Sequence, residues 1–106
     1  MRVSNNILKG IVSVAENIKC IGFAYETAHF IIWESETKKD FNFAVAISKQ
    51  YLNETEEEKD GKKCFSIYVN DNIGNDQWYE ETSDWSPDGL YEQLRYVLDY
   101  IERYYE

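Results

Sequence analysis

The chain has 106 residues, of which 43% are hydrophobic and 29% are charged, and its formal net charge is −9. A chain of this length holds one hydrophobic core, so we expect a single globular domain over residues 1–106. The negative charge argues against direct binding to nucleic acid or to anionic membranes, because both attract lysine and arginine and repel carboxylates.

Cysteine content and the N-terminal sequence indicate the compartment. The chain has two cysteines, Cys20 and Cys64, whereas a secreted scaffold of this size normally carries more. Residues 1–19 lack the continuous apolar core and the cleavage site of a signal peptide. No apolar run is long enough to cross a bilayer. We therefore expect a cytoplasmic protein with reduced thiols.

The first predicted element is an amphipathic helix, for which Ser4 is a suitable N-cap. Its apolar residues recur at the spacing of one helical face. They are Ile7, Leu8, Ile11, Val12, Val14, Ala15 and Ile18. We expect this helix to pack on a sheet.

Five segments that are typical of strands follow, at residues 20–25, 30–34, 41–48, 64–69 and 77–82. Residues 26–29 are predicted to turn the chain, and the charged segment 53–63 is predicted to be a solvated loop. In 41–48 and 64–69, large apolar residues alternate with smaller or polar ones, which predicts one face in the core. The segment 77–82 has glutamates on both faces, which favours a sheet edge.

A second helix is predicted to begin at Ser86, where serine, proline and an acid follow one another as in many helix starts. Its apolar residues fall within one arc. They are Leu90, Tyr91, Leu94, Val97, Leu98, Ile101, Tyr104 and Tyr105. The element order predicts an α+β fold with an N-terminal helix, a five-stranded antiparallel meander and a C-terminal helix packed on one face.

Catalytic and metal-binding motifs are weak in this sequence. His29 is the one histidine of the chain. A small hydrolase would require His29 to lie close to Cys20 and Cys64 in the folded protein, and the spacing of these residues in the sequence does not indicate a Cys–His pair. The segment 70–76 fails the calcium-loop pattern, and no phosphate-binding glycine motif occurs. Adjacent acids such as Glu80 and Glu81 are usually solvated and are not distinguished as an acid and a base. We expect no enzyme activity, metal or cofactor.

Charge and aromatic residues concentrate in residues 70–106, which hold ten acidic and two basic residues, a net charge of −8. Aromatic side chains anchor many interfaces, and carboxylates around them attract a basic partner. The candidate protein-binding residues are Asp71, Asp76, Trp78, Tyr79, Glu80, Glu81, Asp84, Trp85 and Tyr96. The alternative is that Trp78 and Trp85 belong to the core.

In size, acidity and aromatic content the chain resembles small acidic immunity proteins and phage-borne inhibitors of host defence. This resemblance implies a stoichiometric inhibitor that covers the phosphate-binding surface of a basic partner, such as a nuclease toxin. We favour the immunity-protein reading over a phage-encoded anti-CRISPR or anti-restriction protein that mimics nucleic acid. A third hypothesis is a structural or assembly module that forms a homodimer through an exposed strand edge.

Overall fold

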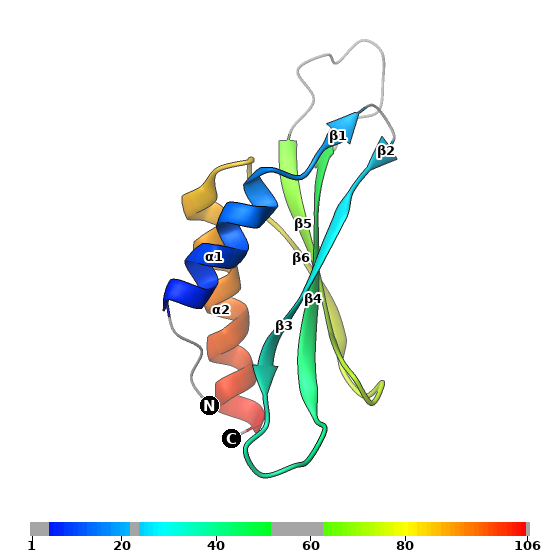
Figure 1. Cartoon of the computed structure of the whole chain (residues 1–106), viewed down its shortest axis with the longest axis vertical. Helices are drawn as coiled ribbons and strands as arrows, with labels where there is room; N and C mark the ends of the chain where they lie inside the picture. Colours follow the sequence, from blue (N-terminus) through cyan, green and yellow to red (C-terminus); the bar gives the residue numbers. More distant parts are fainter. Residues whose placement is uncertain (1–4, 22–23, 52–62, 106) are drawn as a thin grey trace.

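The computed structural model describes residues 5–21, 24–51 and 63–105. Within these ranges, helices α1 and α2 lie on the same side of a four-stranded antiparallel sheet (Figure 1). The predicted α+β fold, with a helix before the strands and a helix after them, is confirmed.

Helix α1 (Asn5–Glu16) packs on the sheet through one apolar stripe, as its periodicity predicted. Its buried residues are Leu8, Ile11, Val12 and Ala15. Ile7 and Val14 were counted with this face, but each is 54% exposed. Ser4, the predicted N-cap, lies outside the described residues. The helix ends at Glu16, whose carbonyl oxygen accepts a hydrogen bond from the Lys49 ammonium.

The main sheet has four strands rather than the predicted five. Strands β1 (Cys20–Ile21) and β2 (Ala24–Tyr25) pair with each other in a separate two-stranded hairpin. The prediction that residues 26–29 form a turn is wrong, because β3 already begins at Thr27. Ala28 and Phe30 pair with β4 and pack against the core, so tertiary contacts favour an extended conformation there.

The main sheet is a meander in the order β3 (Thr27–Glu34), β4 (Asn42–Tyr51), β5 (Lys63–Asp71) and β6 (Gln77–Glu81). Its register aligns Phe30, Val45, Val69 and Trp78 in one row across the four strands. A β-bulge interrupts β3 between Ile31 and Trp33. The strand β6 lies at an edge, as its charge pattern predicted. The loop predicted at 53–63 lies outside the described residues apart from Lys63.

The core lies between the sheet and the two helices. Helix α2 (Pro87–Tyr105) begins as predicted, with the amide of Gly89 donating to the Ser86 hydroxyl at 3.3 Å. It buries Leu90, Leu94, Val97, Leu98 and Ile101. These side chains meet the inward residues of β4 and β5, which are Phe43, Val45, Ile47, Phe65, Ile67 and Val69. Tyr104 was predicted in the buried arc, but it is 64% exposed.

The opposite face of the main sheet, here called the open face, is formed by the alternate side chains of the same strands. No described helix covers it (Figure 1). Its centre carries small residues of β4 and β5, which are Ala44, Ala46, Ser48 and Ser66. Within the described residues, neither helix has the length and apolar character needed to cross a membrane.

Candidate functional site

Strand β6 divides the predicted binding residues between the two faces of the sheet. Trp78 pairs with the inward residue Val69, and Glu80 pairs with the inward residue Ile67. Tyr79 pairs with Tyr68, whose side chain lies on the open face, so Tyr79 and its neighbour Glu81 belong to that face as well. The predicted cluster is therefore two half-clusters that cannot contact one flat surface together.

The first half-cluster joins helix α2. The rings of Trp78 and Tyr100 are 5.3 Å apart, and the rings of Tyr100 and Tyr104 are 4.6 Å apart. Tyr96 precedes Tyr100 by one helical turn and is 61% exposed. Tyr96, Tyr100 and Tyr104 thus form a row along the side of α2 that borders β6. Of these three tyrosines, only Tyr96 was among the binding residues predicted from the sequence. The spacing of four residues between Tyr96, Tyr100 and Tyr104 is the sequence signal that indicates the row.

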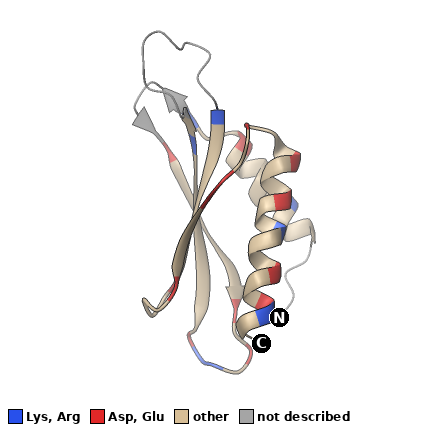
Figure 2. Cartoon of the chain, turned by 180° about the vertical axis from the view of Figure 1, so that it is seen from behind, with Lys and Arg blue, Asp and Glu red and all other residues tan. Residues whose placement is uncertain are grey.

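Carboxylates border this row. Glu80 follows Trp78 on the same side of β6, and Glu92 precedes Tyr96 by one turn of α2. We call the set the α2–β6 surface. It consists of Trp78, Glu80, Glu92, Tyr96, Tyr100 and Tyr104. In Figure 2, acidic positions recur along β6 and α2 on the same side of the molecule.

Glu80 and Glu92 form no salt bridge within the described part of the chain. Arg95 forms its salt bridges with Asp99 at 3.0 Å and with Glu102 at 3.9 Å. The charges of Glu80 and Glu92 are therefore available to a cation from another molecule.

Asp71 was predicted to bind a partner, but its side chain is 3% exposed. One carboxylate oxygen accepts hydrogen bonds from the amides of Ile73, Gly74 and Asn75, at 3.0, 2.6 and 3.1 Å. The other oxygen accepts from the amide of Asp76 at 2.9 Å. The carboxylate thus stabilises the turn between β5 and β6. Gly74 lies in this turn with a φ of 80°, a conformation that glycine adopts readily. Asp76 is half-buried at the end of this turn.

Trp85 and Asp84 have structural contacts at the other end of the sheet. The indole of Trp85 is half-buried against the core, and its Nε1 donates to the Cys64 carbonyl at 2.9 Å. The ammonium groups of Lys49 and Lys63 lie 5.4 and 5.1 Å from the centre of its ring. Asp84 is exposed, and its carboxylate accepts from the Ser86 amide at 2.8 Å before α2 begins. Trp78 is likewise half-buried against the core.

The second half-cluster lies on the open face. The rings of Tyr68 and Tyr79 are 6.4 Å apart, and the two side chains are 43% and 45% exposed. Burial raises the pKa of the Tyr79 phenol, and a hydrogen bond to Glu81 adds to this rise while one to Ser66 opposes it. The hydroxyls of Ser66 and Ser48 are 2.6 Å apart. This part of the face is therefore hydrogen-bonded within itself.

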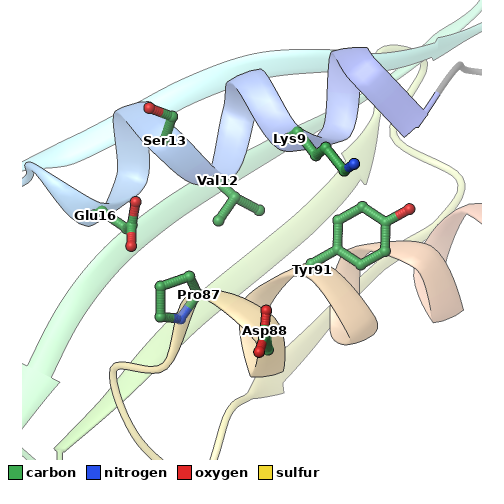
Figure 3. A pocket seen from close by; sticks show the side chains of 7 residues that line it. All are labelled: Lys9, Val12, Ser13, Glu16, Pro87, Asp88 and Tyr91. Carbon is green, nitrogen blue, oxygen red and sulfur yellow. The ribbon is translucent and has the colours of Figure 1, made fainter.

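A groove of about 380 Å³ separates α1 from the first turn of α2. Glu16 and Lys9 lie toward its two ends, and Asp88 and Tyr91 line it from α2 (Figure 3). Asp88 stabilises the start of α2, because a carboxylate in the first turn of a helix interacts favourably with the helix dipole. None of the predicted binding residues lines this groove.

Groups that could support catalysis are dispersed in the described structure. His29 is exposed on edge strand β3, whereas Cys64 is completely buried on β5. The side chain of Cys20 lies outside the described set. The described residues contain no group of three or more His, Cys, Asp or Glu placed to share a metal ion.

No protein-family model, curated protein or solved structure matches this chain. Function is therefore inferred from the residues and their arrangement.

Proposed function

We propose that the protein is a stoichiometric inhibitor of the immunity-protein type, which binds a basic, nucleic-acid-handling protein through the α2–β6 surface. One observation carries the proposal. Exposed tyrosines on α2 stand beside Glu80 and Glu92, which have no salt-bridge partner among the described residues. The low cysteine content supports a cytoplasmic site of action.

The physical argument has a short-range part and a long-range part. Tyrosine and tryptophan rings bury a large area with little loss of side-chain entropy, and they stack favourably on arginine. A net charge of −9 attracts a basic protein over a distance and raises the rate of encounter. Arginines that hold nucleic-acid phosphates in the partner would meet carboxylates and rings instead, which blocks the partner's substrate site.

A matched pair of charge reversals tests the proposal, because Glu80 and Glu81 are neighbours that point to opposite faces. Immobilised protein is used to capture partners from the cytosol of its own cells at about 0.15 M and about 1 M salt. We expect a basic nuclease or other nucleic-acid-binding enzyme that is released at high salt. Glu80→Lys should weaken binding about tenfold, whereas Glu81→Lys, which changes the net charge by the same amount but lies on the other face, should weaken it much less.

Function is then measured on the captured enzyme. Wild-type protein should abolish its nuclease or nucleic-acid-binding activity at one inhibitor per enzyme, and Glu80→Lys should shift this titration to higher concentration. A toxin as the partner supports the immunity reading, and a restriction or CRISPR enzyme supports the anti-defence alternative. Equal loss of binding in Glu80→Lys and Glu81→Lys, or binding without inhibition, would falsify the proposal.

A further inference from the structure

The groove between α1 and the first turn of α2 is lined by charged groups that lack partners in the described part of the chain. Lys9 and Glu16 line it from α1, and Asp88 lines it from α2 (Figure 3). These three side chains are exposed, and none of them forms a salt bridge within the described residues. The groove therefore presents one positive and two negative charges that are available to a ligand.

The order of these charges along the groove restricts the kind of ligand. Lys9 and Glu16 are seven residues apart on α1, which separates their backbones by about 10.5 Å along the helix axis. In Figure 3, Asp88 reaches the groove from α2 at a position between these two ends. From the Lys9 end to the Glu16 end, the charges are thus positive, negative and negative.

Apolar side chains form the part of the groove between the charges. Val12 lines it from α1 and is 6% exposed, and the ring of Pro87 lines it from α2. Tyr91 lies toward the Lys9 end, where its hydroxyl is a further hydrogen-bonding group (Figure 3). A volume of about 380 Å³, with an apolar lining and a few polar groups, is typical of small-molecule sites.

We propose that the groove binds a free α-amino acid with a cationic side chain, that is, lysine or arginine. Such a molecule carries a carboxylate, an α-ammonium and a side-chain cation in this order, so its charges match those of Lys9, Asp88 and Glu16 one by one. Its single net positive charge balances the single net negative charge of the groove lining. Its aliphatic stem covers the apolar surface of Val12 and Pro87.

The length of the ligand fits this arrangement. A zigzag of six or seven bonds of about 1.5 Å places the carboxylate and the side-chain cation of lysine or arginine about 7–9 Å apart. Lys9 and Glu16 can close on the two ends of such a molecule from backbones about 10.5 Å apart, because both side chains are flexible.

The end of α1 supports the proposed orientation. Glu16 is the last residue of α1, and the C-terminus of a helix attracts cations. The Lys49 ammonium reaches this helix end from β4, where it donates to the Glu16 carbonyl. Lys49 does not line the groove, and the Glu16 carboxylate remains available to the side-chain cation of the ligand.

The exposure of the charges limits the affinity. Ion pairs at exposed positions are weak, and the dipole at the start of α2 opposes a cation there. We therefore expect a dissociation constant of about 1 mM. Loss of any one charge pair should weaken binding about threefold to fivefold.

Lysine and three of its derivatives test the proposal, because each derivative lacks one charge. Lysinamide has no carboxylate, Nα-acetyl-lysine has no α-ammonium and Nε-acetyl-lysine has no side-chain cation. Each compound is added to the intact chain at constant ionic strength, up to about 20 mM, which is well above the expected dissociation constant. Shifts of the backbone amide resonances that line the groove are followed by NMR. Lysine should bind about threefold or more tightly than each derivative.

Variants assign each charge of the ligand to its partner. Lys9→Met should weaken the binding of lysine but not that of lysinamide, which has no carboxylate to pair. Asp88→Asn and Glu16→Gln should show the same relation to Nα-acetyl-lysine and Nε-acetyl-lysine, respectively. Glu81→Gln removes an equal charge from the open face and should leave the affinity for lysine nearly unchanged. Urea unfolding checks that each variant is folded.

Three outcomes overturn the inference. Groove resonances that do not shift at about 20 mM lysine leave the groove without this ligand. Equal weakening by Glu81→Gln and Glu16→Gln would mean that lysine is attracted by the overall charge and not by the groove. Binding of Nα-acetyl-lysine as tight as that of lysine would assign the groove to the C-terminal lysine of a polypeptide. None of these outcomes bears on the proposed inhibitor function, which uses the α2–β6 surface.

Discussion

The two faces of the main sheet are made by neighbouring residues of the same strands, yet they differ in almost every physical property. On the helix side, Phe43, Val45 and Ile67 are at most 1% exposed. On the other side, the half-buried Ala44 and Ala46 alternate with these residues, and Ser48 and Ser66 pair through their hydroxyls. The difference shows that the large apolar side chains decide where the helices pack, since burying a small residue gains much less free energy.

Strand β6, at the edge of the sheet, also presents different side chains on the two faces. Trp78 packs toward α2 and the core, whereas Tyr79 stands on the open face beside Tyr68. Shifting β6 by one residue would exchange these two side chains, together with Glu80 and Glu81. The candidate binding surface on α2 therefore depends on the register that the β5–β6 turn sets.

The largest expected effect compares adjacent residues of β5 that point to opposite faces. Ile67→Ala should lower the free energy of unfolding by about 4 kcal/mol, because it leaves a cavity in a fully buried site. Tyr68→Ala should lower it by less than about 1 kcal/mol, because Tyr68 is 43% exposed. Urea unfolding followed by fluorescence measures both. Similar losses in the two variants would mean that the open face is buried in solution, as it is in a tight dimer.

The next effect concerns the turn that fixes the register of β6. Asp71→Ala removes the acceptor for four backbone amides. We expect the free energy of unfolding to fall by about 2–3 kcal/mol, because charge-assisted hydrogen bonds are lost and donors are left unpaired. Asp76→Asn is the control and should change stability by less than about 0.5 kcal/mol. A small effect of Asp71→Ala contradicts the structural role assigned to this carboxylate.

A smaller effect is expected for the hydroxyl pair on the open face. Ser48 and Ser66 are each 5% exposed, and their oxygens are 2.6 Å apart. A double-mutant cycle with Ser48→Ala and Ser66→Ala should give a coupling free energy of about 1 kcal/mol, because either single change leaves a buried hydroxyl with one partner fewer. Additive effects of the two substitutions would show that the hydroxyls do not interact.

The smallest effect is a shift in one titration. Because burial raises the pKa of Tyr79 above 10.0, its phenolate should form at higher pH than that of an unfolded tyrosine. The stabilisation from the neutral phenol is complete below the unfolded pKa and is lost as the pH rises through the folded pKa. Subtracting the phenolate absorbance of Tyr79→Phe from that of wild type isolates this titration, with Tyr68→Phe as the control. A midpoint at or below 10.0 contradicts the assignment.

Much of the fold follows from local pattern. The start of α2 at Ser86 and the alternation in 41–48 and 64–69 each predicted an element that the structure contains. The edge position of β6 followed from glutamates on both of its faces. The pairing of β1 with β2 and the early start of β3 were missed, because β1, β2 and β3 follow one another closely in the sequence and a local pattern does not say where pairing changes partner.

The sequence by itself determined which residues are apolar enough to require burial, and hence the helices, the strands and the class of the fold. Only the tertiary structure decided which side of β6 meets α2, and therefore that Trp78 joins Tyr100 while Tyr79 joins Tyr68. It also decided that Asp71 is held inside a turn rather than exposed. The physical reason is that period-two alternation defines the two faces of β6 but does not indicate which of them is buried, since both carry an aromatic ring and a carboxylate. Helix α2 decides which face is buried, because it packs against one of them.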